Sequence, residues 1–504
     1  MDTDGVERDG VAVEGIAVDG LAVDTAGHPQ RWLVLVIVLL GQFMIVGAVG
    51  TVNIALPSIQ DDLDASASAI QWVLVLYQLG FAVVLVTGGR LGDLWGRKRV
   101  FLLGLGGFVA ASTVAAVAPT IQVLVAARLA QGMFGGVTAP QVLAVIQVAF
   151  PPAERPRAFA AFGMVSGSAF MVGQVMSGGL IRLDLFGLDW RSPFVVNLVL
   201  GVVALVAAAA VLPETGTTRS QRLDLVGVAM ASAGGLLVLY PLIQGRNAGW
   251  PPVFGLLLAA AVPVLVAFVR HERRLAAAGG DPLIDLGLFR ARSFRGGLIV
   301  ALAYSFSTLP TFYVLTLTLQ LGFGFDALEA ALATAPTPLA VIAASLLSAR
   351  LLPRFGRRMV AVAACFGFAA SLAIMATMAL GPRPLHPAHL IPALVLLGTN
   401  NGFGMTSVVN LTLADVTTEH AGSASGLLQT VQQSAAALGV ALAGIVFFGT
   451  VGSVTTLDSY VGGMAATLVG TMASSLLVIA LHRRLPPLPR PDERDELVLP
   501  LRTP

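Results

Sequence analysis

The sequence is poor in charge and in the residue types on which most enzymatic chemistry depends. Only 12% of its 504 residues are Asp, Glu, Lys or Arg, against about 25% in soluble domains. A single cysteine, Cys365, excludes an internal disulfide and a thiolate metal cluster, and we expect this residue to be a small buried side chain. No Gly-Lys-Ser/Thr loop is present to bind the phosphates of ATP. These absences argue against an enzyme, a metal site, a cofactor and a nucleotide-driven machine.

Apolar residues dominate the chain instead. They make up 56% of it, and the mean hydropathy is +0.84. Uncharged runs of about 20 residues recur along the chain, and each is long enough to cross a hydrocarbon core of about 30 Å as a helix. We therefore predict an all-α polytopic membrane protein. Its fourteen expected helices cover residues 32–57, 69–89, 100–118, 120–149, 158–181, 193–212, 224–243, 251–270, 295–319, 327–349, 359–380, 388–414, 422–450 and 462–482.

The two ends of the chain differ from this apolar interior. Residues 1–31 are acidic and repeat the units GVAVE, GIAVD and GLAVD, so they do not resemble a secretory signal, which needs a basic start. Residues 483–504 are rich in proline and charge. We expect both segments to be disordered tails without a packed core.

Basic residues are distributed unevenly between alternate loops. Counted from an N-terminus inside the cell, the loops on the opposite side hold only Arg182, Arg191, Arg246 and Arg383 of the 30 Lys and Arg residues. Because basic residues concentrate in cytoplasmic loops, we expect both termini to be cytoplasmic. Lysine is almost absent and alanine is abundant. This composition indicates a GC-rich bacterial genome, and hence the bacterial plasma membrane.

One basic loop returns later in the chain. The stretch RLGDLWGRK at 90–98 corresponds to RLLPRFGRR at 350–358, 260 residues further on. Repeats with the same orientation in both halves are a transporter architecture, in which the substrate path lies between the halves. The alternative is that two short basic loops resemble each other by chance.

Six stretches of sequence carry a family resemblance. In chain order they are VNIALPSIQDDL, GGRLGDLWGRKR, ARLAQGMFGG, WRSPFVVNLVLG, DPLIDLGLFRARSF and EHAGSASGLLQTVQQSAAALG. With these motifs the chain resembles the 14-spanner drug:proton antiporters of the major facilitator superfamily, over nearly its whole length. The resemblance implies two six-helix bundles, at 32–212 and 295–482, joined by two linker helices and a central cytoplasmic loop at 213–294.

The resemblance assigns a gating role to the charged stretch between the second and third expected helices. In the family, the carboxylate that matches Asp93 lies against a helix N-terminus of the other half, where the helix dipole favours negative charge, and holds the cytoplasmic side shut. The alternative is a solvated loop that only sets the topology. The residues of this motif are Gly89, Arg90, Asp93, Gly96, Arg97 and Lys98.

Arg128 is a charged residue well inside an expected span, where an unpaired charge is costly. The resemblance places it at the central cavity, in contact with the substrate or the proton-carrying site. Gln131 and Gly132 belong to the same motif. The alternative is that the guanidinium only bonds backbone carbonyls and fixes helix packing.

Glycines recur in the fifth expected helix. They include Gly163, Gly167, Gly173 and Gly178, and the spacing of the first two permits close contact between helices. Exporters of the family carry a Gly-Pro pair here, whereas this chain has Gly173-Gln174. The bend that proline would give is therefore not predicted, and this motif alone does not establish export.

The first helix lacks the aspartate that the family carries, because Ala48 stands at that position. All 28 Asp and Glu residues fall in tails, loops or ends of the expected helices. Proton coupling commonly uses a carboxylate or histidine within the membrane. We therefore expect a neutral or anionic substrate rather than a lipophilic cation. Coupling would use a boundary carboxylate such as Asp93 or Asp415, a proton carried by the substrate, or no proton at all.

Several polar and aromatic residues within the spans are candidates for lining a substrate path. Each one alone is explained more simply by a hydrogen bond between helices or by packing. They are Asn53, Tyr77, Gln78, Gln141, Phe312, Asn400, Asn401 and Gln432.

Taken with the resemblance, these features favour a secondary active transporter that exports small amphiphilic molecules, such as drugs or antibiotics, by alternating access and with proton coupling. An uncoupled facilitator or an uptake transporter of the same superfamily is the alternative, and a membrane sensor without transport is a third hypothesis. The expected partners are the substrate, a proton and the lipid bilayer, with no nucleic acid. We expect the chain to act as a monomer.

Overall fold

The computed structural model describes residues 29–151, 154–213, 224–245, 248–280, 282–284, 286–381, 384–414, 421–452 and 455–485. The acidic repeat, the C-terminal residues from 486 onward, and Asp415 all lie outside this part. The predictions made for the two tails therefore remain predictions.

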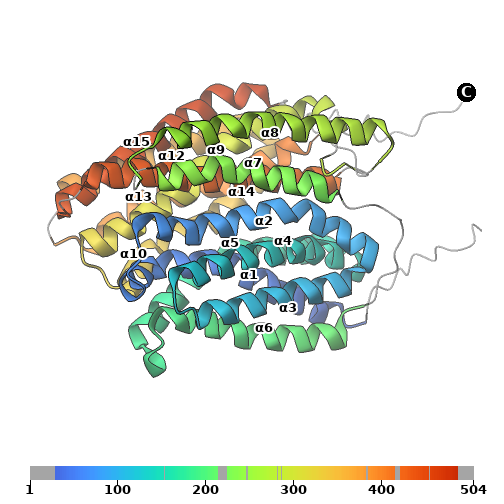
Figure 1. Ribbon diagram of the computed structural model, residues 1–504, viewed down its shortest axis with the longest axis horizontal. Helices are drawn as coiled ribbons and strands as arrows, with labels where there is room; N and C mark the ends of the chain where they lie inside the picture. Colours follow the sequence, from blue (N-terminus) through green and yellow to red (C-terminus); the bar gives the residue numbers. More distant parts are fainter. Residues whose placement is uncertain are drawn as a thin grey trace, which may run out of the picture.

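Long helices side by side make up the protein (Figure 1). The first group is α1 (Arg31–Asp62), α2 (Ala67–Trp95), α3 (Arg97–Ala116), α4 (Ile121–Ala149), α5 (Arg155–Leu183) and α6 (Ser192–Val211). Two central helices follow, α7 (Leu225–Gln244) and α8 (Pro252–Ala277). The last group is α9 (Arg292–Leu317), α10 (Ala327–Thr334), α11 (Pro336–Phe355), α12 (Arg358–Leu380), α13 (Ile391–Thr412), α14 (Ala421–Val451) and α15 (Leu457–Leu481).

Thirteen stretches of the described chain are helical, long and apolar enough to cross a membrane. One of them joins α10 and α11, which are separated at Ala335 because Pro336 begins a new helix. The fourteenth expected span is α13, whose Asn400-Asn401 pair makes it more polar, although its 22 residues suffice for a crossing. The predicted all-α membrane fold is therefore confirmed.

Three helices run well beyond their predicted ends: α2 continues past residue 89 to Trp95, α11 continues past residue 349 to Phe355, and α8 extends furthest. α8 was expected to end at residue 270, but it continues to Ala277 and carries His271 and Glu272 in its last turns. The charged sequence HERR was interpreted as a loop, whereas long helices of membrane proteins extend beyond the hydrocarbon core.

Glycines with a positive φ end two equivalent helices. Gly96, with φ 89°, separates α2 from α3, and Gly356, with φ 52°, ends α11 just before α12. A residue with a Cβ rarely adopts these angles, so glycine permits the short turn at both places. The sequence repeat at 90–98 and 350–358 thus corresponds to two similar helix–turn–helix connections.

The two ends of the helix array differ in charge. We call the end where α1 begins the basic end. Its described residues include Arg31, Arg97, Lys98, Arg99, Arg273, Arg274, Arg354, Arg357 and Arg358. The end where α1 finishes is called the acidic end. Its described residues include Asp61, Asp62, Asp64, Asp184, Asp189, Asp326, Glu329 and Asp458, against Arg182 and Arg191.

The apolar core joins the two groups of helices at one end. A single buried cluster at the acidic end contains Ile54 and Trp72 of the first group together with Tyr313 and Phe447 of the last. Toward the basic end, the first group has its own cluster around Phe101. The last group has a separate one there, which includes Phe294, Met359 and Leu428. Within the described part, the core is therefore continuous between the two groups only at the acidic end.

The central helices cover one side of this junction. α7 packs against both α2 and α14, which contact each other, and α8 packs on the outside of α7 (Figure 1). Where α2 and α14 contact each other, the hydroxyl of Thr430 on α14 donates a hydrogen bond to the backbone carbonyl of Ala82 on α2, at 3.2 Å.

Cys365 was predicted to be buried, and this was wrong. Its side chain is exposed on α12. A helix that borders lipid is apolar on its outer face as well as on its inner face, so the sequence does not distinguish the two.

Candidate functional site

Arg128 is completely buried in α4, as few charged residues are. Its Nε donates a hydrogen bond to the carbonyl of Val73 at 3.2 Å, and one Nη donates to the Gln131 amide oxygen at 2.8 Å. The guanidinium also lies 4.1 Å from the centre of the Tyr77 ring, which attracts a cation to its face. The second Nη has no hydrogen-bond partner among the described residues.

A chain of hydrogen bonds extends outward from this arginine. The Gln131 amide nitrogen donates to the hydroxyl of Ser112 on α3 at 2.7 Å, and the Tyr77 hydroxyl donates to the carbonyl of Ile45 on α1 at 2.7 Å. A Cβ at Gly132 would overlap the backbone carbonyl of Tyr77, so α2 and α4 are in direct backbone contact there. The Arg128 motif therefore connects four helices of the first group, as its packing interpretation predicts. That interpretation leaves the second Nη unexplained.

No acidic partner accompanies Arg128 in the described part of the chain. The other buried charged side chains of this part are Asp224 and Glu272, which lie beside α7 and α8 near the basic end and not beside Arg128. Ala48 is buried in the same apolar cluster as Tyr77. The position of the family's helix 1 acid is thus filled by packed alanine, so the guanidinium is a buried positive charge beside apolar side chains.

The gating motif, residues 89–98, whose role in gating remains a prediction, packs against α4 and the central loop. The Arg97 guanidinium donates a hydrogen bond to the carbonyl of Ala144 at 3.0 Å, and Arg90 donates to the carbonyl of Pro282. Gly89 lies in α2 near Pro140, and Lys98 is half-buried at the start of α3. The backbone of Asp93 belongs to α2, but its side chain lies outside the described part, so its predicted contact remains a prediction.

The glycines of α5 that contact other helices are not the pair that was predicted to do so. Gly163 makes no close contact, because no atom lies within 4 Å of a Cβ placed there, and this part of the motif was wrong. Gly163 lies toward the basic end, where the two groups have separate cores. The surroundings of Gly167 lie outside the described part. Gly173 instead contacts the backbone of Gly47 on α1, and Gly178 contacts the backbone of Ala327 on α10, across the two groups.

Polar side chains bridge the two groups of helices near the acidic end. The Asn53 amide of α1 donates a hydrogen bond to the Thr316 hydroxyl of α9 at 2.9 Å, and the Gln320 amide donates to the carbonyl of Ile54 at 2.9 Å. The Thr334 hydroxyl of α10 donates to the amide oxygen of Gln174 at 3.3 Å. We call these three hydrogen bonds the bridging contacts.

An aromatic pair lies beside the bridging contacts. Phe170 of α5 and Phe312 of α9 have ring centres 5.3 Å apart. On the surface nearby, Arg182 and Asp326 form an ion pair at 3.5 Å between α5 and α10. Asn53 and Phe312 were predicted from sequence to line a path, and they lie at this interface. The roles of Gln174 and Thr334 were missed, because a polar residue in a span does not reveal its partner 160 residues away.

The remaining residues that were predicted to line a substrate path make their contacts within the first or the last group of helices. Gln141 donates hydrogen bonds to the carbonyls of Gly88 and Val137, which is a packing role. Gln78 is buried, and its amide oxygen has no partner among the described residues. The backbone carbonyl of Asn400, and not its side-chain amide, accepts a hydrogen bond from the Tyr304 hydroxyl at 2.7 Å.

Asn401 and Gln432 complete the set. Asn401 accepts from the Tyr304 and Thr308 hydroxyls at 3.4 and 3.3 Å. Gln432 donates to the sulfur of Met405 at 3.5 Å. These two amides therefore connect helices of the last group only.

Comparisons with known proteins are consistent with this fold. A family model described as Major Facilitator Superfamily matches residues 38–224 and 217–440. The "Probable actinorhodin transporter" of Streptomyces coelicolor is 39% identical over 438 residues, which is 86% of this chain and 75% of that protein. The "Puromycin resistance protein pur8" of Streptomyces alboniger is 34% identical, over 90% of this chain and 88% of its own.

Solved structures resemble the chain in fold. The crystal structure of an auto-inhibited POT family peptide transporter matches with a TM-score of 0.66 at 17% identity, over 91% of this chain and 98% of that one. At this identity the likeness concerns the arrangement of helices and not the transported molecule.

Proposed function

The chain belongs to the Major Facilitator Superfamily and is an efflux transporter of that family, and we propose that it exports a neutral or anionic amphiphile in exchange for protons. The observation that carries this proposal is Arg128, buried with one Nη that has no partner among the described residues. A guanidinium of this kind is suited to a carboxylate, a phenolate or another oxygen acceptor of a substrate.

The proposed orientation places the basic end in the cytoplasm. Basic residues concentrate at that side of membrane proteins, and Arg97, Lys98 and Arg99 lie in one of its connections. With both termini on that side, the bridging contacts face the outside of a bacterial plasma membrane. The two groups are then joined on the outer side, and a substrate would enter from the cytoplasm.

The proposed substrate is an antibiotic-like natural product. The relatives named above carry names for transport of actinorhodin and for resistance to puromycin. A cationic drug is the less favoured class, because the described contacts of Arg128 are Val73, Gln131 and Tyr77 with no carboxylate among them, and Ala48 occupies the position of the missing acid.

The coupling group is proposed to lie outside the first helix. Asp93 and Asp415 are candidates because each follows the end of an expected span closely in the sequence, and a proton carried by the substrate itself is the alternative. Uncoupled transport down the substrate gradient is the competing function.

The test is transport into inverted membrane vesicles driven by an imposed pH gradient. Wild type should accumulate neutral or anionic amphiphiles from a mixed panel, and Arg128→Ala should lower the initial rate about tenfold or more, since a hydrogen bond to a charged group contributes about 1.5–3 kcal/mol. Arg99→Ala is the matched control, because Arg99 is exposed at the basic end and its removal should leave the initial transport rate unchanged.

Two outcomes would contradict the proposal. Preferential uptake of cations by wild type would overturn the substrate class. Transport that follows the substrate gradient regardless of pH would overturn the coupling and favour a facilitator. Gel filtration of each variant in detergent distinguishes lost transport from lost folding.

A further inference from the structure

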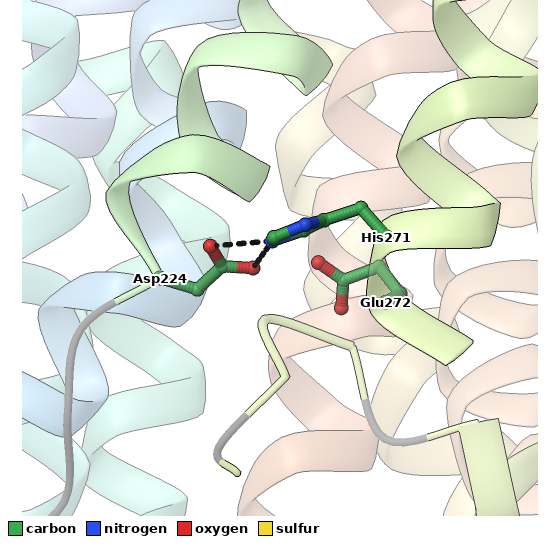
Figure 2. A group of neighbouring side chains, drawn as sticks. All are labelled: Asp224, His271 and Glu272. Carbon is green, nitrogen blue, oxygen red and sulfur yellow. Dashed lines mark hydrogen bonds and ion pairs between the residues drawn. The ribbon is translucent and has the colours of Figure 1, made fainter. Parts of the chain in front are cut away.

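Three ionisable side chains meet between the central helices at the basic end (Figure 2). Asp224 precedes α7 and caps it, since its Oδ1 accepts a hydrogen bond from the backbone N–H of Gly227 at 2.8 Å. His271 lies near the end of α8, with Nε2 2.9 and 3.1 Å from the two Asp224 oxygens. Glu272 is its neighbour in sequence, and one ligand atom from each residue lies within 4.8 Å of the others.

Glu272 is the member of the cluster with an unsatisfied atom. Its side chain is only 1% exposed, and Oε2 accepts a hydrogen bond from the backbone N–H of Ile284 at 2.7 Å. Oε1 is buried and has no hydrogen-bond partner in the described part. Figure 2 shows its carboxylate beside the Asp224–His271 pair. Oε1 and Asp224 Oδ2 both lie over Gly227, where any larger residue would collide with them.

Two carboxylates this close in a buried place repel each other unless a cation or a proton lies between them. We propose that Asp224, His271 and Glu272 bind a divalent transition-metal ion such as Zn²⁺. An imidazole nitrogen and two carboxylate oxygens are ligands that such ions accept. In this structure His271 and Asp224 form a hydrogen-bonded ion pair at 2.9 Å, and an ion would replace the shared proton with a small widening toward the ~3.3 Å edge of a tetrahedron with bonds of ~2.0 Å.

Backbone groups hold the ligands in place. The N–H of Gly227 orients Asp224 and the N–H of Ile284 orients Glu272, as outer-shell donors do at metal sites. Ile284 belongs to the short segment 282–284, whose Pro282 carbonyl accepts from Arg90 of the gating motif. A bound ion would therefore join α7, α8 and the segment that contacts the gating motif.

The experiment measures binding of zinc alone to the purified full-length protein. The protein, without an affinity tag, is treated with a chelator, exchanged into detergent and titrated with Zn²⁺. The background variant is His386→Ala/His389→Ala, because these exposed histidines pair at the acidic end and could bind zinc at the surface. We expect one ion per chain, and a weakening of about a hundredfold when His271→Ala is added, because even outer-shell changes at metal sites cost about 10–100-fold.

Further measurements keep the proposal falsifiable if His271→Ala does not fold. Glu272→Gln conserves shape and hydrogen bonding but removes a charged ligand, and it should weaken zinc binding comparably. Co²⁺ added to the background variant should give the visible absorption of a four-coordinate ion, which Glu272→Gln should lose. The proposal is overturned if the background variant binds no stoichiometric zinc, or if both ligand variants bind it equally well. The cluster would then be two carboxylates sharing a proton beside a histidine. Neither result depends on what the protein transports.

Discussion

Glycine at position 132 determines how closely α2 and α4 approach each other. Its Cα faces the backbone carbonyl of Tyr77, whose ring supports Arg128. Adjacent turns of α4 therefore carry the buried charge of Arg128 and the small residue, Gly132, that lets α2 come close enough for Tyr77 to contact this charge. The close packing of α2 on α4 and the contact of Tyr77 with Arg128 are coupled, because a shift of α2 away from α4 also moves the Tyr77 ring away from the guanidinium.

Gly132→Ala should consequently be destabilising. A methyl group at this place meets backbone that cannot rotate away, so we expect the free energy of unfolding to fall by about 1–3 kcal/mol. The measurement is the thermal midpoint of the purified protein in detergent. Gly163→Ala is the matched control, because that position has open space and should keep the wild-type midpoint. Equal midpoints for the two variants would contradict the close α2–α4 contact.

At the scale of the element, an ion pair fastens the start of α1 to the start of α5. Arg31 donates two hydrogen bonds to Glu154, at 2.7 and 3.0 Å, and these bonds hold the pKa of the Glu154 carboxyl below its ordinary value of 4.5. The carboxylate also lies at the N-terminus of α5, where negative charge is favoured. A group whose pKa is lowered by folding stabilises the fold above its ordinary pKa.

The contribution of this pair should therefore disappear in acid. Arg31→Gln should lower the thermal midpoint at pH 7, and the difference from wild type should shrink from about pH 4.5 downward as Glu154 is protonated in both states. Arg99→Gln is the control, since Arg99 is an exposed cation at the same end. A difference that stays constant down to about pH 3 would show that Arg31 acts by packing and not by charge.

The elements themselves could be predicted from the sequence almost completely. Apolar runs of spanning length are a local signal, so most helix positions agree to within a few residues. The ends of α2, α8 and α11 were the exceptions, because the charged residues that precede Trp95, Ala277 and Phe355 looked like loops. Cys365 was misplaced because lipid and protein core select the same apolar side chains.

The site was less predictable, for a physical reason. Arg128 stands out because a charge within a span is costly, but its contacts with Tyr77 and Val73 depend on where α2 packs. The Gln174–Thr334 contact joins two polar residues that are unremarkable in their own helices. Such pairings depend on how the two halves meet, which no local pattern of the sequence contains.

At the scale of the whole molecule, the bridging contacts must break if the protein works by alternating access. Opening at the acidic end requires Asn53 to part from Thr316 and Phe170 to part from Phe312. The ion pair of Arg182 and Asp326 would separate in the same motion. A covalent link across this end should therefore stop transport without unfolding the protein.

Two cysteines at the bridging contact test this expectation. In a Cys365→Ser background, which removes the exposed thiol, Asn53→Cys/Thr316→Cys should lose transport on oxidation and regain it on reduction. Ser348→Cys/Ser407→Cys is the control, because it links α11 to α13 within one group, where the hydroxyls are 3.4 Å apart, and should leave transport unchanged. Undiminished transport by the oxidised first pair would mean that this contact does not open.

The continuous apolar cluster at the acidic end also has a thermal consequence. Separating the two groups there exposes buried side chains such as Ile54, Tyr313 and Phe447, and the hydration of apolar surface raises the heat capacity. The enthalpy of opening then changes with temperature, so a plot of the logarithm of turnover against reciprocal temperature is curved wherever opening limits the rate. A transporter closed by a few ion pairs would give a straighter line. In this protein, the hydration of the apolar surface exposed on opening would therefore set how steeply the export rate changes with temperature.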